Sequence, residues 1–215
     1  MKNKRTYYHL ILDRSGSMTS CIEQTVDGVN QQIRRIKEVA GRFPEQELVT
    51  SLTLFNNLIS HAWTRMAPNM LRELTFSDYR PDNTTALLDA IGTVVSDLQR
   101  SIGDELISDK ASCVVVIITD GYENSSKNFT HEQVASLIRE LELTGKWTFS
   151  YIGATLDAIE IAAALNIKKC NAMQFNLSES FFVYNKINDS LDSYINKKQS
   201  GKISNGFLED EEEKQ

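Results

Sequence analysis

The sequence predicts an α/β fold in which helices cover both faces of a doubly wound, mostly parallel sheet, giving three α/β/α layers. Two observations lead to this prediction. Segments with a strand pattern alternate along the chain with amphipathic helical segments. One of these strands, residues 113–119, is apolar up to its final threonine, as is typical of a strand covered on both faces. A chain of 215 residues with 41% hydrophobic content fits one such domain.

The first half of the chain predicts a strand, a long helix and a hairpin. Residues 6–12 form the first strand, and Gly41 ends the helix that follows. Residues 47–55 are rich in strand formers, and the turn at Asn56 leads into a second strand over residues 58–63. This second strand is expected to run antiparallel at an edge of the sheet. The apolar face of the helix has residues at steps of four and three, namely Ile22, Val26, Val29, Ile33, Ile36 and Ala40.

The second half continues the alternation and brings the number of expected strands to six. After an irregular stretch from 64 to 84, a helix carries Leu87, Ile91, Val94 and Leu98 on one face. The strand 113–119 is followed by a helix that opens with a capping box, Thr130 to Gln133. The remaining segments are a strand over 146–152, a helix over 156–165, a short strand over 172–175, and a last helix that opens near Ser178 and turns Tyr184, Ile187, Leu191 and Tyr194 inward.

The domain is expected to span residues 1–198, followed by an acidic and disordered tail over 199–215. Periodicity is lost in this tail, and residues 209–213 are all acidic. The net charge is −6, and most of it lies in the tail, so the body offers no basic field for nucleic acid. The sequence has neither a signal peptide nor a membrane span, which favours a cytoplasmic protein without a membrane partner. Its three cysteines show no zinc-binding spacing.

Three remote segments place oxygen-bearing side chains at strand or helix ends. Asp13, Ser15 and Ser17 follow the first strand as Asp-x-Ser-x-Ser, Asp120 follows the strand 113–119, and Thr85 stands at the entrance of a helix. In a doubly wound sheet, ligands bind outside the carboxyl ends of the strands, where the strand order reverses. An all-oxygen site suits a hard divalent cation, with Mg²⁺ preferred and Mn²⁺ or Ca²⁺ as substitutes.

These motifs resemble those of the von Willebrand factor type A domain, a Rossmann-like fold shared with the integrin inserted domain. The run from Ile11 to Met18 is similar to the opening of that family's metal-ion-dependent adhesion site (MIDAS), Thr85 to its threonine, and Thr119-Asp120-Gly121 to its second aspartate. The resemblance covers residues 6–198 and implies the sheet order 3-2-1-4-5-6 with strand 3 antiparallel. It also implies a stand-alone bacterial or phage-like adaptor rather than an enzyme, with an AAA+ ATPase or other intracellular machinery as the partner class that the resemblance suggests.

The expected function is metal-dependent protein binding, in which the cation captures a carboxylate of a partner protein. Within the site, Thr84 is the alternative to Thr85, and Asp120 binds directly or through water. Arg14 and Met18 are expected at its rim, whereas Asp82 and Glu123 are expected to be solvated loop residues. The three histidines, His9, His61 and His131, are expected to be structural.

The competing hypothesis is a Mg²⁺-dependent hydrolase or phosphotransferase that uses the same oxygen site. A haloacid-dehalogenase-type phosphatase also has an aspartate after its first strand, but its usual acid/base lies two residues later, where this chain has Ser15. A third hypothesis is self-association, in which a carboxylate of residues 209–213 enters a neighbour's metal site. We favour a solvating role for these residues, and therefore a monomer or weak self-association.

Overall fold

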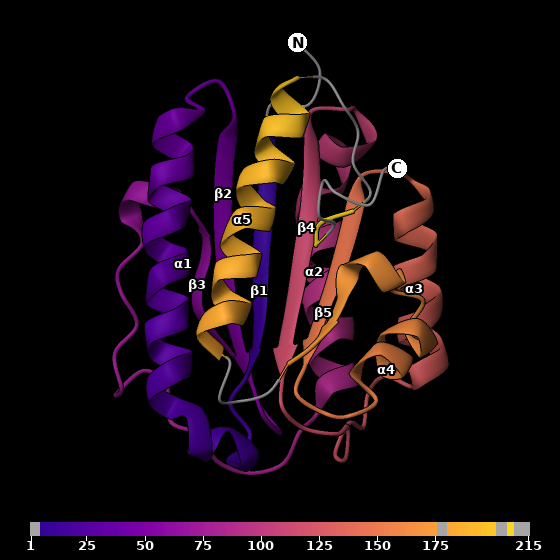
Figure 1. The fold of residues 1–215 in the computed structure, drawn as a ribbon. Coiled ribbons are helices and arrows are strands. Elements are labelled where there is room, and N and C mark those ends of the chain that lie inside the picture. The colour runs from indigo at the N-terminus through magenta and orange to yellow at the C-terminus, as the bar shows by residue number, and fades with distance from the viewer. Residues whose placement is uncertain (1–4, 176–179, 201–205, 209–215) are drawn as a thin grey trace, which may run out of the picture.

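The computed structural model describes residues 5–175, 180–200 and 206–208. In this part of the chain, six strands form one sheet in the order β3-β2-β1-β4-β5-β6 (Figure 1). All neighbouring strands pair in parallel except β2 and β3, which are antiparallel. The doubly wound sheet with one antiparallel edge strand is therefore confirmed. The strands are β1 (Arg5–Asp13), β2 (Glu47–Phe55), β3 (Ile59–Met66), β4 (Ala111–Thr119), β5 (Trp147–Gly153) and β6 (Ala172–Gln174).

Helices cover both faces of the sheet and form two separate cores. On one face lie α1 (Ile22–Arg42) and α5 (Ser180–Gln199), and on the other lie α2 (Leu87–Ile107), α3 (His131–Leu143) and α4 (Ala158–Ala164) (Figure 1). β4 contributes to both cores because its side chains alternate. Val114, Val116 and Ile118 pack with α1 and α5, whereas its alternate residues pack with the other three helices. The apolar run of this strand therefore arises, as predicted from the sequence, because both of its faces are covered.

The local signals in the sequence act as expected at the ends of several elements. In the β2–β3 turn, Asn56 Oδ1 accepts a hydrogen bond from the Leu58 N–H at 2.8 Å, which closes the hairpin. The capping box of α3 is formed by Thr130 and Gln133. After α3, Gly145 has φ +68°, a left-handed conformation that glycine adopts without strain.

α5 lies close to α1 because Gly28 of α1 has no side chain. A Cβ at this position would lie 2.0 Å from the Tyr184 ring of α5. At the other end of α5, the Lys198 ammonium donates to the Arg5 carbonyl at 2.7 Å and to the hydroxyls of Thr6 and Ser112 at 2.6 and 2.8 Å. Burial lowers the pKa of Lys198 to about 7. The last turn of α5 is thus fixed to the amino ends of β1 and β4.

The expectation of disorder over 199–215 is wrong for residues 206–208. The Phe207 ring is buried, with its centroid 6.0 Å from that of Tyr8 and 6.2 Å from that of Tyr194. The Phe207 N–H donates to Asn171 Oδ1 at 2.6 Å, and Leu208 is buried beside it. This short segment completes the core between β1 and α5. The acidic run at 209–213 lies outside the described residues.

Among the described residues, the helices include none that is both long and apolar enough to cross a membrane.

Candidate functional site

The five candidate residues lie at the carboxyl end of the parallel strands. Asp13 is the last residue of β1, and Asp120 directly follows β4. β1 and β4 are paired neighbours up to Leu12 and Ile118, so the two aspartates emerge side by side. From β1 the chain continues to β2 on one side, and β4 begins the other half of the sheet. The site therefore occupies the point where the strand order reverses.

A chain of hydrogen bonds joins the first loop to the second aspartate. Asp13 Oδ1 accepts from the Ser15 N–H at 2.7 Å. The Ser15 and Ser17 hydroxyl oxygens are 3.1 Å apart, and the Ser17 hydroxyl donates to Asp120 Oδ1 at 2.6 Å. Ser15 is buried and Ser17 is exposed, so the chain leads from the end of the sheet to the surface.

Thr85 joins this group beside Gly121. A Cβ built on Gly121 would lie 3.1 Å from Thr85 Oγ1, 3.3 Å from Ser17 Oγ and 3.7 Å from Asp13 Oδ2. Oxygen atoms from two segments, the loop after β1 and Thr85, thus lie around this position, which stays free because residue 121 is glycine. Asp120 joins the group through its hydrogen bond from Ser17. Thr84, the alternative to Thr85, is exposed, whereas Thr85 is 3% exposed. The geometry favours Thr85.

Two residues that sequence reasoning missed fix the position of Asp13. The Thr119 hydroxyl donates to Asp13 Oδ2 at 2.6 Å. The Tyr79 hydroxyl donates to the Asp13 carbonyl oxygen at 2.6 Å, and its ring is buried. Thr119 belongs to the motif Thr119-Asp120-Gly121, but the motif did not predict its hydrogen bond to Asp13. Tyr79 lies in the irregular stretch between β3 and α2, where no pattern pointed to it.

Thr85 is held by the loop that follows β4. Its N–H donates to Asn124 Oδ1 at 2.9 Å, and its carbonyl oxygen accepts from the Asn124 N–H at 3.0 Å. On the other side, the Ala86 N–H donates to the Asn56 carbonyl oxygen of the hairpin turn at 2.9 Å. The backbone around Thr85 is therefore bound from both sides.

The same loop caps α2, whose own N-cap residue makes no side-chain bond. Glu123 Oε2 accepts from the Leu88 N–H at 2.9 Å, and the Ser126 hydroxyl accepts from the Asp89 N–H at 3.0 Å. Glu123 also accepts bonds from Ser125 and Ser126. The prediction that Glu123 is a solvated loop residue is wrong, because free N–H groups at a helix start attract a carboxylate. Asp82 is exposed, as predicted.

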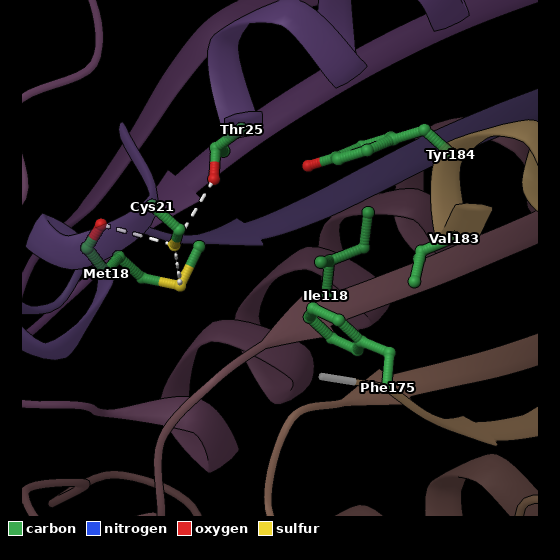
Figure 2. A pocket seen from close by; sticks show the side chains of 7 residues that line it. All are labelled: Met18, Cys21, Thr25, Ile118, Phe175, Val183 and Tyr184. Atoms are coloured by element: carbon green, nitrogen blue, oxygen red, sulfur yellow. Dashed lines mark hydrogen bonds between the residues drawn. The ribbon is translucent and has the colours of Figure 1, made fainter. Parts of the chain in front are cut away.

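Met18 does not line the rim, and that prediction is wrong. Its side chain is buried and points, with Cys21, into an apolar pocket beneath the site (Figure 2). The Cys21 thiol donates to the Met18 carbonyl oxygen at 3.3 Å and accepts from the Thr25 hydroxyl at 3.6 Å. Ile118, Phe175, Val183 and Tyr184 complete this pocket (Figure 2). Met18 therefore anchors the loop to the core between the sheet and helices α1 and α5. Arg14 is half-buried.

The two carboxylates of the site are in an unfavourable electrostatic environment. Burial raises the pKa of Asp13, and the hydrogen bonds from Thr119 and Ser15 offset this only in part. Burial also raises the pKa of Asp120. Within the described part of the chain, neither carboxylate forms an ion pair with a basic side chain. A positive charge placed among these oxygens would relieve this cost.

Histidine, cysteine and carboxylate clusters give no competing site. Over the residues described, there is no group of three or more such side chains that could hold a metal. His9 Nε2 and His61 Nδ1 both contact Thr53 Oγ1, at 2.8 and 2.9 Å, and these contacts lie within the sheet. Structural roles for these two histidines agree with this arrangement. Hydroxyl groups, rather than histidines, complete the set around Asp13 and Asp120.

Asp89 fixes the far end of the loop after β4, and we expect its replacement by Asn to cost about 2 kcal/mol at pH 7. Its carboxylate accepts from the N–H groups of Lys127, Asn128 and Phe129 at 2.8–2.9 Å. Burial raises the pKa of Asp89, but these bonds outweigh it and lower the pKa overall. The stabilisation is thus present above the ordinary pKa and is lost as the pH falls through the lowered value.

Urea unfolding between pH 7 and pH 3 measures this effect, with the exposed Asp104→Asn as control. The difference between wild type and Asp89→Asn should shrink as the pH falls. A difference that stays constant with pH would contradict the role of the charge.

The comparisons with known proteins identify the fold. No protein-family model matches the sequence, and no curated protein sequence matches it significantly. Solved structures do match. Proximal thread matrix protein 1 from the mussel byssus, with a zinc-occupied MIDAS motif, has a TM-score of 0.60 at 17% identity, covering 89% of this chain and 49% of that chain. A von Willebrand factor type A protein from Catenulispora acidiphila gives 0.56 at 11% identity, covering 88% and 43%.

A third match is the manganese-loaded TRAP protein of Plasmodium vivax, with a TM-score of 0.53 at 14% identity, covering 84% of this chain and 72% of that chain. The chain spans less than half the length of the mussel and Catenulispora proteins. At these identities the likeness concerns the fold. This protein has the fold of the von Willebrand factor type A domain.

Proposed function

We propose that this protein is a metal-dependent protein-binding module. A divalent cation is held by Asp13, Ser15, Ser17, Thr85 and Asp120, and it captures an acidic residue of a partner protein. The observation that carries this proposal is the space beside Gly121 at the switch point of the sheet, where oxygen atoms of the loop after β1 and of Thr85 converge, with Asp120 hydrogen-bonded to Ser17. The mussel protein with a zinc-occupied MIDAS and the manganese-loaded TRAP protein support a divalent cation in this fold.

The chemistry of the donor set explains why such an ion would bind a partner. Two carboxylates at most neutralise a divalent ion, and the three hydroxyls add no charge. Mg²⁺ prefers six oxygen ligands and keeps water where the protein supplies fewer, and Mn²⁺ or Ca²⁺ accept similar ligands. A carboxylate from another protein replaces such a water with a charged ligand. Asp120 acts in this proposal either directly or through a water molecule.

We propose binding rather than catalysis because the site has no proton carrier at the expected place. Two residues after Asp13, where a phosphatase of the haloacid dehalogenase type has its acid/base, the side chain is the Ser15 hydroxyl, which lies against Ser17. The partner is therefore proposed to be a protein bound without turnover. An AAA+ ATPase is one proposal for its class, based on the family resemblance.

The test of this function is a pull-down from a lysate of the source cells in Mg²⁺ and in EDTA. Wild type should retain proteins in Mg²⁺ that EDTA releases, whereas Asp13→Asn should retain none of them. Asp27→Asn, on an exposed part of α1, serves as the matched control and should behave as wild type. Identical retention in all conditions would contradict the proposal, as would phosphatase turnover of p-nitrophenyl phosphate that Asp13→Asn abolishes.

The space beside Gly121 gives a second prediction. We expect Gly121→Ala to weaken Mn²⁺ binding by about 10-fold or more, because the added Cβ lies within 3.3 Å of the hydroxyl oxygens of Thr85 and Ser17. Calorimetric titration with Mn²⁺ measures this. Gly103→Ala is the control, since a Cβ there meets nothing within 4 Å. Unchanged affinity in Gly121→Ala would show that the ion binds elsewhere.

A further inference from the structure

Exposed apolar side chains stand next to the candidate site. Leu156 is 87% exposed, the highest value among the large apolar residues that are described, and Tyr122 is 55% exposed. Both belong to loops at the carboxyl end of the sheet, Tyr122 after β4 and Leu156 after β5. Leu143 is similarly exposed, but it ends α3 and therefore lies away from these loops.

Tyr122 and Leu156 belong to one surface. The Ala154 N–H donates to the Thr119 carbonyl oxygen at 3.1 Å, which joins the loop after β5 to the end of β4. The Tyr122 hydroxyl reaches the carboxylate of Asp157, the residue after Leu156, and this contact raises the pKa of the phenol. Tyr122 also directly follows Gly121, against which the oxygens of Thr85 and Ser17 lie. The apolar surface thus borders the space in which the cation is proposed to bind.

We propose that Tyr122 and Leu156 form a docking surface for a bulky apolar residue that neighbours the captured carboxylate in the partner. This inference rests on the proposed function, since it names the kind of partner which that site recognises. The occupant is a protein segment in which an Asp or Glu is flanked by residues such as Leu, Ile or Phe.

Charge and apolar surface support this occupant together. The cation turns a site of two carboxylates into one that accepts an anion. The partner's acidic residue is therefore fixed at the cation that Asp13 and Asp120 hold. Chain neighbours of that residue then fall within a few ångströms of Gly121, where Tyr122 begins the apolar surface. Covering an exposed leucine and a tyrosine ring contributes affinity that a polar neighbour cannot supply.

The test uses peptide pools coupled to beads. One pool has a central Asp flanked on both sides by a mixture of Leu, Ile and Phe, and a second has the same Asp flanked by Ser, Gly and Asn. Both are repeated with Asn in the central position. The amount of full-length protein retained is measured in Mg²⁺ and in EDTA, for wild type, for Tyr122→Ser with Leu156→Ser, and for Leu143→Ser as the matched control.

The expected result is that wild type and Leu143→Ser, in Mg²⁺, are retained about 10-fold more by the apolar-flanked Asp pool than by the polar-flanked one. The double variant should lose this preference but keep metal-dependent retention. Equal retention of wild type by both Asp pools, or an unchanged preference in the double variant, would overturn this inference alone. Retention independent of Mg²⁺ and of the central Asp would overturn the proposed carboxylate capture as well.

Discussion

Replacement of Asp13 by Asn is expected to abolish the stabilisation of this protein by divalent cations. At a Mg²⁺ concentration 100 times its dissociation constant, wild type should gain about 2.7 kcal/mol in its free energy of unfolding. The variant should gain nothing, because an amide is a poor ligand for a hard cation and the site loses one of its two charges. Urea unfolding with and without Mg²⁺ measures both values. A gain that persists in Asp13→Asn would show that the ion binds elsewhere.

The same variant should have the opposite effect in EDTA. Burial raises the pKa of Asp13, so the native protein keeps a proton on this carboxyl when the unfolded chain, with a pKa near 3.8, has lost it. Wild type therefore loses stability as the pH rises from 3.8 through the raised value. Asn has no such carboxyl to protonate, so the metal-free variant should be more stable than wild type at pH 7. Asp27→Asn, exposed on α1, should match wild type in both experiments.

Replacement of Phe207 by Ala is expected to lower the free energy of unfolding by about 3 kcal/mol. The ring is 2% exposed and lies between the rings of Tyr8 and Tyr194, so its removal leaves a cavity between β1 and α5. Urea unfolding at equilibrium measures the loss. The exposed Phe76→Ala is the matched control and should change stability by less than about 0.5 kcal/mol.

A loss below about 1 kcal/mol in Phe207→Ala would show that residues 206–208 do not contribute to the core in solution. A chain shortened after residue 200 should then be as stable as the full one. If the packing contributes as described, this shortened chain should be destabilised at least as much as Phe207→Ala.

The helices and strands could be predicted because their sequence signals lie within short segments. The side chains of β4 alternate between two cores, so nearly every position of this strand is apolar. The capping box of α3 needs only residues 130–133. Phe207 and Leu208 escaped prediction because two apolar residues within a polar tail have no period. Their contacts are with residues remote in sequence, such as Asn171, whose Oδ1 accepts a hydrogen bond from the Phe207 N–H.

The candidate site was predictable in its ligating side chains but not in its supports. Asp13 and Asp120 follow recognisable strands, and their proximity follows from the pairing of β1 with β4. The supports are contacts between distant segments. Tyr79 bonds a carbonyl oxygen, and Glu123 caps a helix that begins 36 residues earlier, at Leu87. Such bonds produce no regular spacing in the sequence. A carboxylate in a polar loop is therefore predicted to be solvated unless the position of a neighbouring helix end is known.

The loops of the site are bonded to one another through their main chains, and this affects how fast the site can work. The Gly16 N–H donates to the Asn83 carbonyl oxygen at 2.9 Å, the Asp82 N–H to that of Arg14 at 3.0 Å, and the Asn124 N–H to that of Thr85 at 3.0 Å. The loops therefore lose their conformational entropy during folding rather than when the ion binds. We expect ion entry to be limited by the loss of water from the ion and partner docking to be a nearly rigid-body encounter, with association rates that do not depend on loop closure.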